Sequence, residues 1–295
     1  MKYPLYPPDL VDSAKSGQLV PFVGAGLSIP CGGKSWDELL QQLLAELQVE
    51  IGHEALMEEI LTCASRVPGI RPGLLGDIKT AFARLYDPLM VAQIYAERFK
   101  PRRLIDVLRD MCRAISQPSA VHDLLCSLEC RVYVTTNYDN LLERALSNSG
   151  VRAVPVFREE DLAYWTSSDV HVIKMHGSLA DVFDPESVVI TRSDYEAYSL
   201  KHPNLDLLIQ FIMSTGTLLL LGYSLRDPEF LAIHDRVRYH LKSHKRLVYL
   251  IAFDLPEVLQ DYWAGYGVYP LNLDGKDKEA AIMSWLTELK ARIAR

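Results

Sequence analysis

Short apolar runs recur along the whole chain, and this recurrence constrains the fold more than any other feature. The runs are rich in Val, Leu, Ile and aromatic residues, and several end directly in glycine or in a cluster of polar residues. Such uninterrupted runs are typical of parallel strands that are covered on both faces. The predicted strands are Leu19–Val23, Arg131–Thr136, Val154–Phe157, His171–Lys174, Val188–Ile190, Thr217–Gly222, Leu247–Phe253 and Gly267–Leu273.

Helical patterns separate these runs. Ser35 and Glu38 have the spacing of a capping box, and the leucines that follow recur at helical period. Further helices are predicted at Asn140–Leu146, Asn204–Met213 and Asp277–Ile293. Strands that alternate with helices predict an α/β fold built on a doubly wound, parallel, Rossmann-like sheet. Ligands of such sheets bind beyond the carboxyl ends of the strands.

Residues 51–118 interrupt this alternation. Prolines divide the segment into several predicted helices, and no strand pattern stands out. We therefore predict an all-helical insertion at 51–118 within a Rossmann-like domain made of residues 1–50 and 119–295. The length of 295 residues fits this division, because single cores stop growing at roughly 250–300 residues.

The charge balance argues against one class of partner. The chain has 31 basic and 38 acidic side chains, which give a formal net charge of −7. A broad basic face is therefore not expected, and we predict no strong direct binding of nucleic acid. The basic stretch Lys100–Arg103 is interpreted as a solvated loop followed by a helix start.

Cysteine usage and hydropathy point to the cytoplasm. The five cysteines include no Cys-x-x-Cys pair, so we expect reduced thiols and no metal site. The N-terminus lacks the pattern of a signal peptide. The longest apolar run, Leu247–Phe253, is too short to cross a membrane, so no membrane association is expected.

A glycine-rich stretch directly follows the first predicted strand. In Gly24-Ala25-Gly26-Leu27-Ser28, the two glycines allow a tight turn and a close approach of the backbone to a pyrophosphate. Free amides near a helix start attract its negative charge, and the Ser28 hydroxyl can add a donor. The alternative is a plain turn, since Gly-x-Gly-x-Ser alone is a weak signal.

Polar residues also follow the second strong strand, in Thr136-Asn137-Tyr138-Asp139. Asn137 is suited to orient a water molecule or to hold a ribose hydroxyl, and Asp139 to accept hydrogen bonds from a carboxamide. Asn and Asp are equally good helix caps, so either residue could instead cap the helix Asn140–Leu146. The local sequence leaves both interpretations open.

Two further clusters end strands. His176, in Met175–Ser178, is a candidate general base near neutral pH, although a histidine in a loop is more often merely hydrogen-bonded. Gly222 and Ser224 form a second candidate turn for contacting phosphate or ribose. For Asp227, which precedes Pro228, we favour a helix cap.

Taken in this order, the four clusters resemble the sirtuin superfamily over roughly residues 15–50 and 130–255. Gly24–Ser28 is similar to the NAD loop of that family, and Thr136–Asp139 stands at the place of its Gln-Asn-Ile-Asp motif. His176–Gly177 matches its catalytic His-Gly, and Gly222–Ser224 matches its late Gly-Thr-Ser turn. The resemblance implies NAD+ as the substrate.

The departures from the sirtuin pattern are informative. Sirtuin deacylases carry a zinc ribbon of two Cys-x-x-Cys pairs after the catalytic histidine, whereas this chain has no cysteine after Cys130. The chain is more similar to the sirtuin-like domains of bacterial antiphage defence, which resemble NAD+ glycohydrolases. Some of these work with a ring-forming translocase ATPase or an Argonaute-type protein. The resemblance therefore implies an NADase activated by a partner, and we also expect a homo-oligomer.

The resemblance also implies roles for single residues. Asn137 and His176 are the predicted catalytic residues, with Asn137 positioning ribose or water and His176 taking a proton. The predicted NAD-binding residues are Gly24, Ala25, Gly26, Ser28, Thr136, Asp139, Gly222, Ser224 and Asp254. Two alternatives are an NAD-dependent protein deacylase or ADP-ribosyltransferase, and a non-enzymatic nucleotide-binding assembly module. A dehydrogenase is disfavoured, since no acidic residue clearly ends a second strand about 20 residues after the glycine loop.

Overall fold

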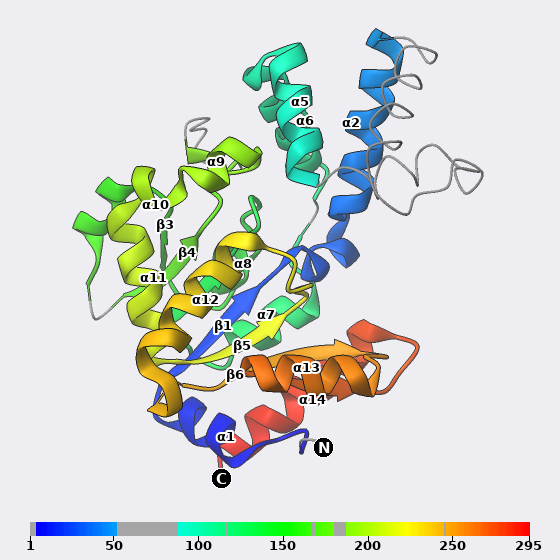
Figure 1. Ribbon diagram of the computed structural model, residues 1–295. Coiled ribbons are helices and arrows are strands. Elements are labelled where there is room, and N and C mark those ends of the chain that lie inside the picture. Colours follow the sequence, from blue (N-terminus) through cyan, green and yellow to red (C-terminus); the bar gives the residue numbers. More distant parts are fainter. Residues whose placement is uncertain (1–3, 52–87, 116, 167–168, 180–186, 245) are drawn as a thin grey trace.

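The computed structural model describes residues 4–51, 88–115, 117–166, 169–179, 187–244 and 246–295. Its centre is a sheet of seven strands in the order β3-β4-β2-β1-β5-β6-β7, and every strand pair is parallel (Figure 1). The strands are β1 Leu19–Val23, β2 Val132–Thr135, β3 Ala153–Val156, β4 Val170–Lys174, β5 Thr217–Leu221, β6 Val248–Phe253 and β7 Val268–Leu273. The predicted doubly wound, Rossmann-like α/β fold is thus confirmed.

One predicted strand is wrong. Residues Val188–Ile190 are buried but join no strand of the sheet. The Val189 amide donates to the carbonyl of His176 over 3.1 Å, which is a single bond rather than a ladder. Val188 and Ile190 pack among helices, so their apolar character reflects helix contacts.

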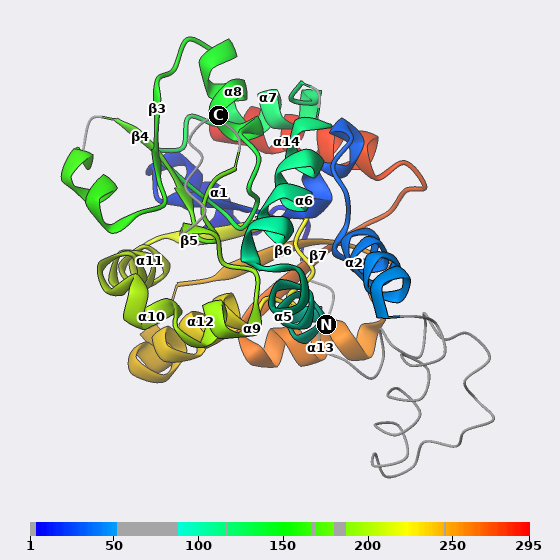
Figure 2. The same ribbon diagram turned by 90° about the horizontal axis from the view of Figure 1, so that it is seen from above.

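Helices cover both faces of the sheet (Figure 2). The helices are α1 Pro8–Lys15, α2 Trp36–Ile51, α5 Pro88–Phe99, α6 Pro101–Arg113, α7 Ala120–Cys126, α8 Leu141–Asn148, α9 Arg192–Glu196, α10 Tyr198–Lys201, α11 Pro203–Thr215, α12 Pro228–Leu241, α13 Glu257–Tyr266 and α14 Lys278–Ile293. Helices α1, α7, α8 and α14 pack on one face, and α11 and α12 pack on the other.

The apolar runs of the strands follow from this double cover. In β5, Leu219 and Leu221 face the first helix layer, while Leu218 and Leu220 face the second. All four leucines are 0% exposed. Successive side chains of a strand point to opposite faces, so a strand covered on both sides needs apolar residues at every position.

Helix starts follow the predicted signals. The carboxylate of Glu38 accepts from the Ser35 amide over 2.7 Å, and the Ser35 hydroxyl accepts from the Glu38 amide over 3.2 Å, which is the predicted capping box. Asp277 caps α14 by accepting from the amide of Ala280 over 3.1 Å.

A second core, built mainly by helices, stands above the carboxyl edge of the sheet (Figure 1). Leu43 of α2, Tyr95 of α5 and Leu108 of α6 are among its buried residues. The described part of the predicted insertion is therefore helical, while residues 52–87 lie outside the described residues. Helix α2 precedes the predicted boundary at 51 but shares this core, and the domain division stays a prediction.

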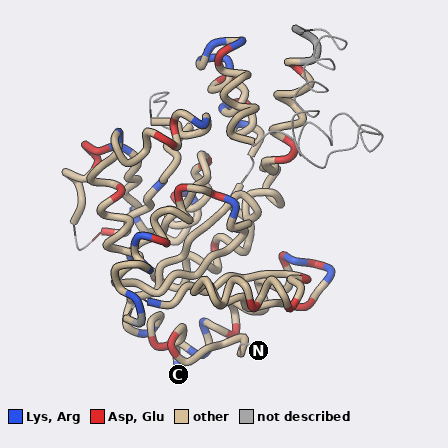
Figure 3. The backbone as a smooth tube through the Cα atoms, in the orientation of Figure 1, with Lys and Arg blue, Asp and Glu red and all other residues tan. Residues whose placement is uncertain are grey.

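The loop between α5 and α6 carries the basic stretch Lys100–Arg103. It forms a blue tip on the helical core in the tube view (Figure 3). All four of its residues are exposed, and Arg103 pairs with Glu46 over 3.1 Å. Pro101 is the first residue of α6, so the stretch is a solvated loop followed by a helix start, as predicted.

The order of the strands sets where a ligand can sit. The chain leaves β1 for β2 on one side and returns to β5 on the other side of β1. The carboxyl ends of β2 and β5 therefore flank that of β1, and the crevice at such a reversal is where ligands of open α/β sheets bind. None of the described helices is both long and apolar enough to span a membrane.

Candidate functional site

The glycine loop after β1 packs directly on the turn after β5. A Cβ atom added to Gly24 would lie 2.5 Å from the Gly222 carbonyl oxygen, and one added to Gly26 would lie 2.8 Å from it. Gly222 itself has a φ of 62°, and a Cβ there would lie 2.4 Å from the amide nitrogen of Leu27. Glycine is thus required at all three positions by contact between two backbones.

Most amides of the loop are already used within the protein. The Gly24 amide donates to Leu221 and the Gly26 amide to Gly222, each over 2.9 Å. The Leu27 and Ser28 amides donate to carbonyls of the loop itself. The expectation of free amides therefore does not hold for these groups. Gly26 is exposed and Ala25 half-buried, so the loop presents its peptide backbone at the edge of the sheet.

A buried hydrogen-bonded chain joins the loops after β1 and β2. The Asn137 side-chain amide donates to the Ser28 hydroxyl over 3.0 Å, and that hydroxyl donates to Asp139 Oδ2 over 2.8 Å. The exposed fractions of Ser28, Asn137 and Asp139 are 4%, 8% and 9%. Three residues singled out in the sequence are thus brought into one network.

Asp139 combines the two roles that the sequence left open. Its Oδ1 accepts from the amide of Leu141, the first residue of α8, over 3.1 Å, although the N-cap position itself is Asn140. Its Oδ2 is the oxygen that accepts from Ser28. Capping a helix and belonging to the network are therefore compatible.

A buried lysine that the sequence analysis missed binds the backbone of this network. Lys174, the last residue of β4, is 1% exposed. Its ammonium donates to the carbonyl oxygen of Asp139 and lies 3.0 Å from Glu143 Oε1. A lysine at the end of a strand whose other residues are mostly apolar is the one sequence signal that pointed to it.

Thr135 ties the end of β2 to that of β1. Its hydroxyl donates to the Val23 carbonyl over 2.8 Å and accepts from the Asn137 amide over 3.0 Å. The Thr136 amide donates to the same carbonyl over 3.4 Å. These bonds fix the direction in which Asn137 leaves the sheet.

His176 lies at the end of β4 and is 4% exposed. The turn behind it depends on Gly177, which has a φ of 86°. Its Nδ1 is 3.5 Å from the Tyr195 hydroxyl, and the two rings meet edge to face with centroids 5.1 Å apart. The Nε2 atom of His176 is 3.1 Å from Asp227 Oδ2, which is an ion-pair distance, and this buried nitrogen makes no hydrogen bond of good geometry with the described residues.

Asp227 is the predicted cap of α12, and its contact with His176 is the second feature that the sequence analysis missed. Its Oδ1 accepts from the amides of Glu229 and Phe230 over 2.9 and 3.1 Å. Burial acts to raise the pKa of Asp227, but His176 and the two amides outweigh burial and hold that pKa below its ordinary value.

The remaining predicted residues lie on the same edge but outside the buried network. Ser224 and Asp254 are both exposed, and Asp254 follows β6, two strands from β1. Among the described residues, no group of three or more His, Cys, Asp or Glu side chains is placed to hold a metal ion.

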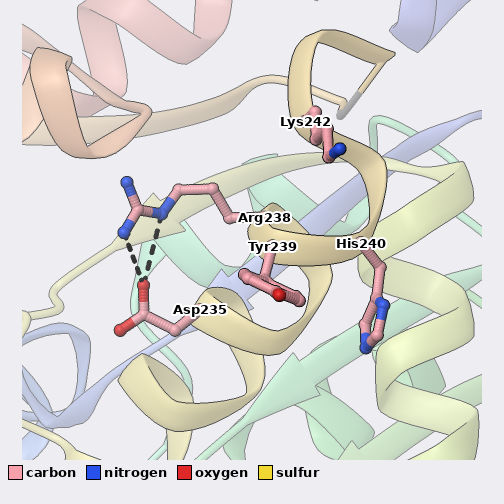
Figure 4. Close-up of a pocket in the computed structure, with 5 residues that line it drawn as sticks. All are labelled: Asp235, Arg238, Tyr239, His240 and Lys242. Atoms are coloured by element: carbon pink, nitrogen blue, oxygen red, sulfur yellow. Dashed lines mark hydrogen bonds and ion pairs between the residues drawn. The ribbon is translucent and has the colours of Figure 1, made fainter.

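A separate hollow lies at the other end of α12 (Figure 4). It is lined by Asp235, Arg238, Tyr239, His240 and Lys242. Helix α12 starts at the carboxyl edge and runs back toward the start of β6, so this hollow is at the opposite edge of the sheet. It shares no residue with the network around Asn137.

Residues 131–271 match the family described as the SIR2-like domain. The chain is 30% identical over 244 residues to an NAD(+) hydrolase ThsA of Acinetobacter baumannii, which covers 82% of this chain and 44% of that protein. It is 27% identical over 219 residues to defense-associated sirtuin 2 of Bacillus subtilis, which covers 74% of this chain and 19% of that protein. The chain spans less than half the length of each of these relatives. A solved Sir2 homologue in complex with ADP-ribose is similar at 15% identity with a TM-score of 0.45, covering 98% of each chain.

Proposed function

Because the chain contains a SIR2-like domain, we propose that it is an NAD+ glycohydrolase that cleaves NAD+ to nicotinamide and ADP-ribose in bacterial antiphage defence. The names of the relatives support this proposal, since one is an NAD(+) hydrolase and another a defense-associated sirtuin. The observation that carries it is the buried network of Ser28, Asn137 and Asp139 at the reversal of strand order, with His176 following β4, the neighbour of β2 in the sheet.

The reaction needs little acid assistance. Nicotinamide leaves as a neutral base from a cationic ring nitrogen, and the transition state has oxocarbenium character, as in glycoside hydrolysis generally. A protein that catalyses it has to hold the ribose, admit one water molecule and accept a proton. Asn137 and His176 are of the right type for the last two tasks.

Each side chain of the network has a part in the proposal. Asn137 orients ribose or water, because its carbonyl oxygen can accept while its amide is held by Ser28. His176 takes the proton. Asp139 holds the carboxamide of nicotinamide, with Ser28 keeping its carboxylate in place.

The edge of the glycine loop is the proposed pyrophosphate site. Gly26 and Ala25 offer an accessible backbone to the diphosphate, and Gly222 holds that backbone in place. Half-buried Thr136 and exposed Ser224 flank the loop on the neighbouring strands. Asp254 is the outermost residue, and we assign it to the adenosine ribose.

Incubation of the purified chain with NAD+, with chromatography of the products over time, tests the reaction. We expect nicotinamide and ADP-ribose, and loss of both products in His176→Ala and Asn137→Ala. His240→Ala and Asn148→Ala are matched controls, because these residues lie far from the network, on α12 and α8. Undiminished turnover in the two site variants, with unchanged thermal melts, would contradict the assignment.

The alternatives make different predictions in the same assay. An ADP-ribosyltransferase or deacylase releases nicotinamide only when an acceptor protein or an acylated peptide is added. A binding module retains NAD+ without releasing nicotinamide under any of these conditions.

We further propose that activity depends on assembly, with further copies of the chain or with a separate sensor. A ring-forming translocase ATPase or an Argonaute-type protein would suit the sensor role. The reason is physiological, since an unregulated NADase depletes the NAD+ of its own cell. Turnover measured against protein concentration, with light scattering for mass, tests this. Full turnover by a dilute monomer would refute it.

A further inference from the structure

The carboxylate of Asp227 serves two structures at once. Its Oδ1 accepts from two amides at the start of α12, and its Oδ2 faces His176 Nε2 at 3.1 Å. An ordinary helix cap needs only the first set of bonds. The second oxygen therefore requires an explanation of its own.

The loop that carries Asp227 is held in an unfavourable conformation. Leu225 has a φ of 54° and is 3% exposed. The left-handed region is unfavourable for a bulky residue, so surrounding contacts impose this path. This path brings Asp227 close to His176. Asp227 comes after β5 and His176 comes after β4, and two strands, β2 and β1, lie between β4 and β5 in the sheet.

We infer that Asp227 is a positioning residue that orients the His176 ring and keeps its proton on Nε2. The lone pair of the neutral ring is then on Nδ1, which makes Nδ1 the atom that accepts a proton. The Tyr195 hydroxyl, 3.5 Å from Nδ1, marks the side from which that proton arrives. The claim that Nδ1 acts as a base rests on the proposed function. The claim that the proton of His176 is on Nε2 does not.

Other groups around His176 do not replace Asp227. Tyr195 and Tyr138 present aromatic rings, with centroids 5.1 and 6.5 Å from that of His176. Glu229 on α12 is a second carboxyl group that interacts electrostatically with His176, and burial raises the pKa of Glu229 to about 7. Asp227 stays ionised at lower pH than Glu229, because its pKa is held below the ordinary value. It is therefore the carboxylate that meets the ring.

Asp227→Asn separates positioning from capping. Its side-chain oxygen can still accept from the two helix amides, and asparagine is a good cap. The remaining NH2 group then faces His176 Nε2 and can only donate, so Nε2 must accept and the ring proton moves to Nδ1. Asp277→Asn is the matched control, because Asp277 caps α14 through the Ala280 amide.

Nitrogen-15 NMR of histidine-labelled protein at pH 8.5 reports the tautomer, since an ordinary imidazole is neutral there. The resonances of His176 are identified among the eight histidines by their loss in His176→Gln. We expect a proton on Nε2 in the native chain and in Asp277→Asn, and a proton on Nδ1 in Asp227→Asn. A proton on Nδ1 in the native chain would overturn the inference, and so would an unchanged tautomer in folded Asp227→Asn.

The native spectrum decides the matter even if Asp227→Asn fails to fold. Asp227→Ser, which retains a capping hydroxyl, then replaces it as the variant, and mixed tautomers are expected. NAD+ turnover is a second readout, for which we expect a loss of about 10⁴-fold in Asp227→Asn, as a wrong histidine tautomer causes elsewhere. Absence of turnover in the native chain would indicate either an enzyme that needs its partner or a binding module, and the NMR result would stand in both cases.

Discussion

Lys174 is the side chain whose removal should disturb the fold and the site together. Its ammonium is buried between the Asp139 carbonyl and the Glu143 carboxylate, and the lysine is 1% exposed. Lys174→Met keeps the length and apolar stem of the side chain but removes the charge and the donor. Glu143, at 16% exposure of its side chain, then loses its cationic partner.

The size of the effect follows from these contacts. Removing one partner of a buried ion pair costs about 3–5 kcal/mol, because an uncompensated charge remains. Because Glu143 is partly exposed, solvent weakens the ion pair, and its loss should cost about 3 kcal/mol, the lower end of that range. The unpaired carbonyl of Asp139 adds about 1 kcal/mol. We therefore expect the free energy of unfolding to fall by about 4 kcal/mol.

Urea unfolding followed by circular dichroism measures this loss. Lys290→Met is the control, since Lys290 is exposed on α14 and its replacement should change stability by less than about 0.5 kcal/mol. In Lys174→Met with Glu143→Leu, neither charge is left unpaired, and most of the loss should be recovered. If Lys174→Met is as stable as Lys290→Met, the buried pair does not support the site as argued.

Three further changes test other parts of the structure. Gly177→Ala should lower the free energy of unfolding by at least about 2 kcal/mol, because the added Cβ would lie 2.4 Å from the Ser187 carbonyl oxygen. Gly150→Ala is the control and should cost less, because Gly150 has a similar φ of 75° but open space around it. Equal losses of the two variants in urea unfolding would contradict the clash. Burial raises the pKa of Glu229 from 4.5 to about 7, so the folded state holds its proton longer and stability falls as pH rises through that range, by up to roughly 3 kcal/mol. Glu229→Gln should flatten this part of the pH dependence of unfolding, and an unaltered slope would refute the cause. Leu43→Ala should lower the free energy of unfolding by about 2–5 kcal/mol, because Leu43 is buried in the helical core. Amide hydrogen exchange should become faster in α2, α5 and α6 than in the strands of the sheet. Uniform loss of protection would argue against a separate core.

The sequence alone determined the seven strands of the sheet and the edge at which the candidate site lies, although it also predicted a strand at Val188–Ile190 that is wrong. Strands buried on both faces need apolar residues at every position, so runs such as Leu218–Leu221 can be recognised without a structure. Capping residues such as Ser35 act within one turn of helix, and their spacing is therefore visible in the sequence. Parallel strands align their carboxyl ends, which is why residues after β1, β2, β4 and β5 were expected to meet.

Only the tertiary structure decided which of these groups meet, and how. Gly26 packs on Gly222, and Asp227 reaches His176, because the strand order places β5 beside β1 and a strained loop directs the start of α12. The sequence analysis read Asp227 as a cap alone, since capping is local and its second contact is not. Lys174 was missed for the same reason. Its partners Asp139 and Glu143 are distant from it in the sequence, and no sequence pattern shows that the three residues meet in a buried cluster.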